Sequence, residues 1–273
     1  MLQNSRAIGC CHPDWVNHVA TAFQDKFEAI AQKQVPLHIN VWLDCGGIGT
    51  EMHAAECITK GLAPFGVDVS FHLFGGSDKC EHASAAVQHA FAPKHWSQDI
   101  LDRNLGTGQF MCAVHDTDTC TLPRESMEVY SASFPCGPWS PRGARQGLKD
   151  PKDGDLIWKV LDAIAYMRPF LFMLENVLEI ATEGDGDVES SDLDKIVKVM
   201  KKKLGAYHVI MLYGVCPSSF GFPIVRKRWH CLGSRINNQL EIVADRFINL
   251  PPLPKGTPCQ RQFLFIINVI TNH

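Results

Sequence analysis

Phe170-Leu-Phe-Met-Leu174 is followed directly by Glu175-Asn-Val177. The five apolar residues form an unbroken run, which suits a strand that is buried on both faces of a parallel sheet. Open α/β sheets bind their ligands at the carboxyl ends of such strands. We therefore expect residues 170–174 to form a central strand, with functional side chains in the Glu-Asn-Val segment that follows it.

Strand-like and helix-like patterns alternate on both sides of this run. Short apolar runs predict strands at residues 37–43, 67–74, 207–215 and 229–232, and one more that ends near Tyr130. Apolar residues that recur every three or four positions predict helices at residues 14–33, 156–168 and 193–204, and one more after Asp78. The alternation predicts an α/β fold with a doubly wound, mostly parallel sheet. Residues 101–128 show no clear period, and residues 184–191 are expected to form an acidic surface loop.

The composition is that of a globular protein with a full hydrophobic core. Of its 273 residues 45% are hydrophobic, and the formal net charge of −3 argues against binding to nucleic acid through bulk charge. Eleven cysteines include no Cys-x-x-Cys pair and no zinc-like spacing, so we expect no metal site and no disulfide framework. No leader or long apolar span is recognisable, which predicts an intracellular protein in a reducing compartment, away from membranes.

Cys136 lies on a loop that two prolines stiffen. Pro135 and Pro138 flank it, just after the strand that ends near Tyr130. Proline restricts both its own backbone and that of the preceding residue, so the direction of the thiol is nearly set. This is how a nucleophile is held towards a substrate, whereas a core cysteine behaves as a small hydrophobe. Both interpretations stay open on this loop alone.

A glycine-rich turn joins the strand at 37–43 to the next helix. Its sequence is Gly46-Gly47-Ile48-Gly49. Glycines at this position let a ligand approach the backbone closely, and the helix N-terminus offers free N–H groups. The Gly-x-Gly-x-x-Gly spacing is not present, which makes a dinucleotide the weaker choice. A plain tight turn is the alternative.

Two aspartates follow the next two predicted strands. Asp78 can accept hydrogen bonds from both hydroxyls of a ribose, and a helix N-cap is an equally good interpretation. Asp99 can face an adenine amino group, although by itself it is better explained as a turn residue. Position alone therefore makes both of them candidates for a nucleotide-like ligand.

The last candidates are one acidic residue and two arginines. Partial burial at a strand end would raise the pKa of Glu175 and let it act as an acid, whereas a cap bonded to backbone is the alternative. Arg226 and Arg228 alternate on an extended segment, so both can face one site, or both can lie on a solvated basic edge.

These parts, in this order, resemble the cytosine-C5 methyltransferase family over roughly residues 37–235. The most specific stretch runs from Phe134-Pro135-Cys136 to the Glu-Asn-Val segment. The resemblance implies a Rossmann-like sheet of the S-adenosylmethionine-dependent methyltransferase type. It implies S-adenosylmethionine as the cofactor, with contacts from Cys45, Gly47, Ile48, Gly49, Asp78, Asp99 and Pro135. The domains expected are a helical extension at 1–35, a catalytic domain at 36–240 and a tail of unassigned role at 241–273.

The resemblance also implies a reaction. Cys136 matches the nucleophile that attacks C6 of cytosine, and Glu175 matches the carboxylate on the cytosine edge. Arg226 and Arg228 match the arginines beside the target base. The expected activity is that of a DNA cytosine-5 methyltransferase, with DNA as partner and, in a eukaryotic cell, a nuclear location.

Several positions depart from the family pattern. Gly137 and Ile224 stand where the family usually has glutamine, and Cys45 replaces an aromatic residue. No target-recognition region or Gln-x-Gly-Asn motif is recognisable after the arginines. An RNA cytosine methyltransferase, such as the tRNA-directed branch, is therefore an alternative. So is a non-catalytic remnant that binds cofactor and needs a second chain, whereas a nicotinamide oxidoreductase is disfavoured by the glycine spacing.

Overall fold

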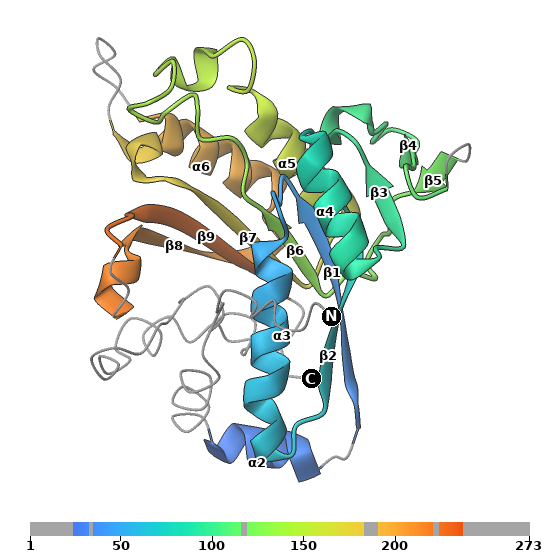
Figure 1. The fold of residues 1–273 in the computed structure, drawn as a ribbon. Coiled ribbons are helices and arrows are strands. Elements are labelled where there is room, and N and C mark those ends of the chain that lie inside the picture. The colour runs from blue at the N-terminus through green and yellow to red at the C-terminus, as the bar shows by residue number, and fades with distance from the viewer. Residues whose placement is uncertain (1–23, 33–34, 116–118, 183–190, 221–223, 237–273) are drawn as a thin grey trace, which may run out of the picture.

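A seven-stranded sheet runs through the computed structural model (Figure 1). The structure describes residues 24–32, 35–115, 119–182, 191–220 and 224–236. The sheet order is β3-β2-β1-β6-β7-β9-β8, and only β9 runs against its neighbours. Its strands are β1 (Leu37–Asp44), β2 (Val69–Ser77), β3 (His95–Ser97), β6 (Val129–Ala132), β7 (Leu171–Val177), β8 (Tyr207–Val215) and β9 (Arg228–Arg235). The predicted doubly wound, mostly parallel α/β sheet is confirmed.

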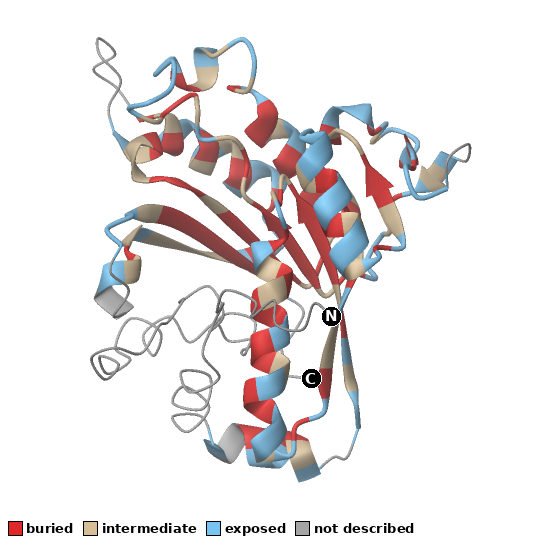
Figure 2. Ribbon diagram, viewed as in Figure 1, coloured by how far each residue is buried: buried red, intermediate tan, exposed pale blue. Residues whose placement is uncertain are grey.

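Helices cover both faces of this sheet (Figure 1). One face packs against α2 (Gln24–Gln32), α3 (Thr50–Leu62) and α4 (Glu81–Phe91). The other face packs against α5 (Leu156–Met167) and α6 (Asp192–Lys203). Short 3-10 turns connect these elements: η1 (Ala63–Phe65), η2 (Ile100–Asp102), η3 (Gly147–Lys149), η4 (Leu178–Ala181) and η5 (Pro217–Phe220). The strands form the buried centre of the molecule, as Figure 2 shows.

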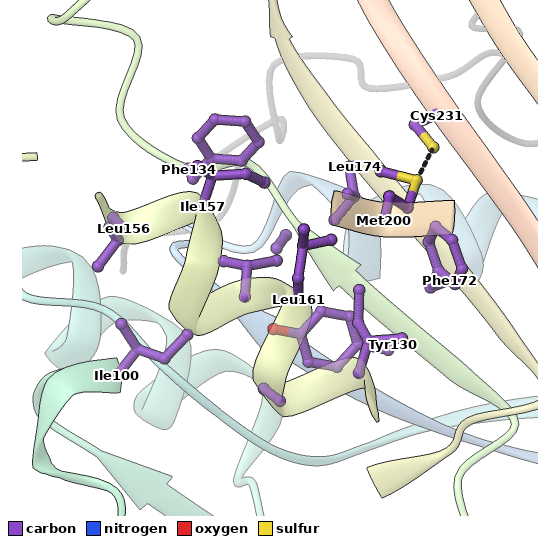
Figure 3. Close-up of a cluster of buried hydrophobic side chains, with 14 of the residues drawn as sticks. Ile100, Tyr130, Phe134, Leu156, Ile157, Leu161, Phe172, Leu174, Met200 and Cys231 are labelled. Atoms are coloured by element: carbon purple, nitrogen blue, oxygen red, sulfur yellow. Dashed lines mark hydrogen bonds between the residues drawn. The ribbon is translucent and has the colours of Figure 1, made fainter. Parts of the chain in front are cut away.

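Strand β7 lies at the centre of the core and is buried on both faces, as its unbroken apolar run predicts. Leu171 and Met173 pack into the cluster below α3, whereas Phe172 and Leu174 pack into the cluster below α5 and α6. Figure 3 shows the second cluster, in which Phe172 and Leu174 face side chains from α5 and α6. Alternate residues of one strand therefore stabilise two helical layers.

Helix ends follow the local sequence signals. Ser191 caps α6, because its hydroxyl accepts from the backbone N–H of Asp194 while the Asp194 carboxylate accepts from the backbone of Ser191. Helix α5 ends at Arg168, which adopts a left-handed conformation before Pro169. The first ten residues of the helix predicted at 14–33, and its last one, lie outside the described residues. So do most of the acidic loop at 184–191 and the whole tail at 241–273, so the domain boundaries remain predictions.

Strand β2 is longer than the sequence predicts. The sequence predicts a strand over residues 67–74, which ends before Gly75 and Gly76, but the pairing with β1 continues to Ser77. A Cβ at Gly75 would lie 2.5 Å from the Trp42 ring, and one at Gly76 would lie 2.0 Å from the Leu43 carbonyl. These glycines serve close packing between strands, not a turn.

The segment at 101–128, which the sequence left unassigned, contains a small hairpin. Strands β4 (Gln109–Met111) and β5 (Thr119–Thr121) pair antiparallel and lie beyond β3 at the edge of the molecule (Figure 1). The pairing covers three residues on each side, which is too short to produce a visible alternation in the sequence.

A buried ion pair ties this segment to the carboxyl end of β1. The Asp44 carboxylate is fully buried, and Arg103 binds it through two nitrogens, one at 2.6 Å. Tyr130 donates to the same carboxylate at 2.7 Å, Ser77 at 2.8 Å and Trp42 at 3.1 Å. Burial raises the pKa of the Tyr130 hydroxyl well above its usual range, which keeps that group a donor. The Asp44 charge is therefore fully compensated.

We predict that Arg103→Met destabilises the fold by about 3–5 kcal/mol, because it leaves a buried, uncompensated carboxylate. The matched control is Glu125→Gln, which removes a pair with Arg168 that is exposed on both sides and should cost at most about 1 kcal/mol. Urea unfolding of both variants measures the difference. Equal costs would contradict the central role of the buried pair.

Candidate active site

The candidate residues gather at one edge of the sheet. Parallel strands have their carboxyl ends on the same side, so the segments that follow β1, β2, β3 and β6 meet there. The glycine turn follows β1, Asp78 follows β2, Asp99 follows β3 and Cys136 follows β6. Glu175 lies near the carboxyl end of β7. The residues predicted to bind the cofactor and those predicted to bind the target base therefore share this edge.

The glycine turn leaves open space on one side. Gly47 and Gly49 have φ values of 55° and 77°, in the left-handed region that favours glycine. A Cβ on Gly49 would lie 2.8 Å from the Phe91 ring, whereas one on Gly47 would meet nothing within 4 Å. Ile48 is 64% exposed beside this open space. The turn thus packs inward through Gly49 and leaves room outward at Gly47.

Asp78 and the glycine turn are directly connected. One carboxylate oxygen of Asp78 accepts from the Gly47 backbone N–H at 2.8 Å, and the other accepts from Cys80 N–H at 2.8 Å. The N-cap alternative is wrong, because Cys80 is the N-cap of α4 and the helix has no side-chain cap. Each carboxylate oxygen has two lone pairs, so capacity for two ribose hydroxyls remains.

Asp99 has the turn role that its position suggested. It caps η2 by accepting from the Leu101 N–H at 3.0 Å, and Lys79 Nζ lies 3.4 Å from its other oxygen. Its side chain is 18% exposed. A capping carboxylate that keeps an accessible oxygen can still accept from an adenine amino group, so the two interpretations are compatible.

Cys45 is a different kind of thiol from Cys136. It lies half-buried at the end of β1 with a φ of 52°, and burial, followed by the charge of Asp44, raises the pKa of its thiol far above the usual range. A neutral thiol at this position can contact a cofactor but cannot act as a nucleophile. Cys136, in contrast, is exposed.

Backbone hydrogen bonds hold the Cys136 loop in place. The Cys136 carbonyl accepts from the backbone N–H groups of Trp139 at 3.0 Å and Ser140 at 2.8 Å. Two residues earlier, the Phe134 carbonyl accepts from the Asn176 side chain at 2.9 Å. Pro135 lies half-buried between these two anchors. The loop is therefore bonded both to itself and to β7.

Glu175 and Arg228 form an ion pair on neighbouring strands. Arg228 Nε lies 2.9 Å from the Glu175 carboxylate, and both side chains are mostly buried. Burial raises the pKa of Glu175, while the positive charges of Arg228 and Arg226 oppose that shift. The backbone-cap alternative for Glu175 does not hold, since its partner is a side chain. Arg226 is exposed and acts on Glu175 only through its charge.

The site also contains two groups to which the sequence interpretation assigned no individual role. Glu51, in the first turn of α3, accepts from the Ser133 hydroxyl at 3.1 Å and is half-buried. Asn176 is fully buried and bonds the Cys136 loop. An acid in a first helical turn normally favours the helix dipole, so nothing in the sequence marks Glu51 as a site residue. Its contact exists only because β1 and β6 are neighbours.

A family model described as C-5 cytosine-specific DNA methylase matches residues 80–261, more than half of the chain. This chain belongs to that family. The matched region includes the Cys136 loop, the Glu175 strand and both arginines.

Two curated methylases illustrate the relationship. The Type II methyltransferase M.HaeII of Haemophilus aegyptius is 26% identical over 170 residues, which cover 62% of this chain and 46% of the relative. M.BsuFI of Bacillus subtilis is 32% identical over 147 residues, which cover 54% of this chain and 31% of the relative. The chain thus spans less than half the length of these relatives.

Solved structures support the fold. A prophage-encoded E. coli protein, assigned as a DNA modification methyltransferase, matches with a TM-score of 0.53 at 18% identity, over 79% of this chain and 52% of the other. The Dnmt2 methyltransferase of S. pombe matches with a TM-score of 0.50 at 19% identity, over 80% of this chain and 57% of the other. At this identity the likeness concerns the fold alone.

The methylase loop around Cys136 contains a close glycine contact. A Cβ at Gly143 would lie 1.8 Å from the Gly137 carbonyl oxygen, whereas a Cβ at Gly137 would meet nothing within 4 Å. Gly137 departs from the family's usual glutamine, and the space beside it leaves room for a longer side chain. Glycine is required at position 143, not at 137.

We predict that Gly143→Ala destabilises the protein by about 1–3 kcal/mol, because the added methyl group overpacks the loop. Gly137→Ala, its control within the same loop, should change stability by no more than about 0.5 kcal/mol. Chemical denaturation measures both. A Gly137 variant as costly as the Gly143 variant would show that the contact is not decisive.

A second prediction concerns the pH dependence of stability. Burial raises the pKa of Glu51 in the folded protein, against the lowering effect of its hydrogen bonds from backbone and Ser133. A raised folded-state pKa stabilises below the unfolded value, about 4.3, and that contribution is lost as the pH rises through the folded value. Wild type should therefore lose stability relative to Glu51→Gln as the pH rises. Unfolding curves of both proteins, measured at a series of pH values from the unfolded pKa upward, test this prediction. A difference in stability between them that stays constant or changes in the opposite direction would contradict it.

Proposed function

We propose that this chain transfers a methyl group from S-adenosylmethionine to C5 of cytosine in DNA, through a covalent bond between Cys136 and C6. One observation carries the proposal. The Asn176 side chain bonds the Phe134 carbonyl at 2.9 Å, and this couples the Cys136 loop to the strand of Glu175. A nucleophile and an acid on rigidly joined elements can act on one ring.

The residues at the ends of β1 and β2 fit the cofactor. The open space at Gly47, the exposed Ile48 and the spare lone pairs of Asp78 favour a nucleoside placed across the ends of β1 and β2. Asp99 would accept from the adenine, while Cys45 and Pro135 would line the pocket. When bound, S-adenosylmethionine supplies an electrophilic methyl group on a sulfonium sulfur.

The Cys136 loop and the Glu175–Arg228 pair fit the cytosine. The Cys136 thiolate would attack C6, and the electron pair of the C5–C6 double bond would move towards C5. The Glu175 carboxyl, whose pKa burial raises, would donate a proton or hydrogen bond at N3 to stabilise the ring charge. C5 would then take the methyl group from the sulfonium sulfur, which would be left as a neutral thioether. Loss of the C5 proton to water would restore the C5–C6 double bond and release the Cys136 sulfur from C6 as a thiolate.

The arginines would position the base. Arg228 is bonded to Glu175 at 2.9 Å and would hold O2 of the cytosine while it keeps the carboxyl in place. Arg226 is exposed and would face the nucleic acid beside the base. The target cytosine must leave its base stack to reach Cys136, as for other enzymes that act on a base.

Target recognition is the least specified part. The chain spans 46% and 31% of the two relatives, so we place the recognition element outside the described residues or on a second chain. For the compartment, we expect a reducing one and, in a eukaryotic cell, the nucleus. In the part that the structure describes, no helix is long and apolar enough to cross a membrane.

A covalent trap tests the reaction. The protein is incubated with S-adenosylmethionine and either a pool of DNA duplexes or tRNA, each containing 5-fluorocytosine. Because fluorine at C5 blocks the final elimination, a denaturant-resistant adduct should form with DNA. No adduct should form with Cys136→Ala, and adduct formation should be much slower with Glu175→Gln.

The control is Cys80→Ala, which removes another exposed thiol near the cofactor edge and should leave trapping intact. An adduct with tRNA alone would favour the RNA methyltransferase alternative. Cofactor binding by calorimetry without any adduct would favour a cofactor-binding remnant that needs a partner chain. Trapping that survives Cys136→Ala would overturn the assignment of the nucleophile.

A further inference from the structure

Four metal-binding side chains converge at the edge of the sheet, away from the methyl-transfer groups. They are His95 on β3, Cys112 and His115 in the segment after β4, and Cys120 on β5. One ligating atom from each lies within 4.8 Å of all the others. Three separate elements therefore contribute to one cluster.

The backbone holds these residues in position. The His115 N–H donates to the Cys112 carbonyl at 3.2 Å, which closes a turn between the two ligands. Ala113 N–H donates to the Trp96 carbonyl at 2.7 Å and attaches this turn to β3, next to His95. Cys120 lies on β5, opposite Phe110 of β4. The convergence thus follows from regular pairing and a tight turn.

The side chains contact one another as ligands around a common centre do. His115 Nδ1 lies 3.2 Å from Cys112 Sγ and 3.1 Å from Cys120 Sγ. The rings of His95 and His115 are 5.4 Å apart. Nδ1 of His95 is buried without a hydrogen-bond partner among the described residues. One imidazole nitrogen carries at most one proton, so it cannot satisfy two sulfurs as a donor.

We infer that His95, Cys112, His115 and Cys120 bind one zinc ion as a tetrahedral Cys2His2 site. Zinc prefers thiolate and imidazole ligands, at about 2.3 Å for sulfur and 2.0–2.1 Å for nitrogen. Ligands around such an ion lie roughly 3.3–3.8 Å apart, within the spread of this cluster. Two thiolates balance the charge of the ion, and four protein ligands leave no position for water. The site is therefore structural and not catalytic.

The cluster lies partly inside the protein. His95 and Cys120 are half-buried, whereas His115 is exposed. Cys112 is 3% exposed, so the sulfur is shielded from bulk solvent.

The ion would stabilise the β4–β5 hairpin. Two three-residue strands cannot stand alone, because an isolated two-stranded ribbon is marginal in water. A metal bound to β3, β5 and the connecting turn would attach the hairpin to the sheet edge. The same β3 leads into Asp99, so the ion would also brace one wall of the proposed cofactor pocket.

The sequence contains no Cys-x-x-Cys pair and no familiar zinc-like spacing of cysteines, which is why it predicts no metal site. The cluster instead reads Cys112-x2-His115-x4-Cys120, with His95 supplied from another strand. A mixed Cys-His-Cys string of this kind is a weak signal by itself. The fourth ligand, 17 positions earlier, becomes visible only in the fold.

The zinc content of the protein tests the metal site without any measurement of methyl transfer. The outcome is therefore independent of the proposed function. Full-length protein without a polyhistidine tag is purified with no added metal and analysed by plasma mass spectrometry. About one zinc per chain is expected. Cys112→Ser, Cys120→Ser and His115→Asn should each weaken zinc binding by at least about tenfold. Cys80→Ser and His89→Asn, exposed on or beside α4, are the matched controls and should retain the metal.

A second measurement covers variants that fail to fold. Wild-type protein loaded with Co²⁺ should show the visible absorption of tetrahedral cobalt bound by thiolates, and a chelator should expose Cys112 and Cys120 to alkylation. Protein that neither contains zinc nor binds added Zn²⁺ would overturn the site. So would zinc retained in both cysteine variants, or a Cys112–Cys120 disulfide in a non-reduced digest.

Discussion

The buried carboxylate of Asp44 is the constraint on which the rest of the structure depends. A charge in the core is tolerated only with full compensation, and five hydrogen bonds from Trp42, Ser77, Arg103 and Tyr130 provide it. The donors come from β1, β2, β6 and the segment before the hairpin. One carboxylate therefore sets how three strands and an edge segment meet, immediately before the glycine turn.

A second set of contacts relates the two halves of the proposed site. Asn176 bonds the backbone before Cys136, and Ser133 bonds Glu51 at the start of the helix that follows the glycine turn. The Cys136 loop is thus connected to the base side through β7 and to the cofactor side through α3. Such ties keep reacting groups in register, which matters because small misplacements of reacting atoms cost much of the rate.

Much of the fold could be predicted because its signals are local. The unbroken apolar run of β7, the capping box at Ser191 and the strand–helix alternation each occupy a short window. The pair Gly75-Gly76 was misinterpreted because glycine serves turns and close approaches equally well. Only the Trp42 ring and the Leu43 backbone, more than thirty positions away, decide between them.

By itself, the sequence determined the sheet type, the Cys136 loop and the residues matching the methylase pattern, because strand periodicity and motif order are written along the chain. Only the tertiary structure decided which groups meet: Arg228 with Glu175, Arg103 with Asp44, and His95 with the hairpin cysteines. These pairings depend on strand order and on the path of an irregular segment. Both are properties of long-range packing, which no short window of sequence contains.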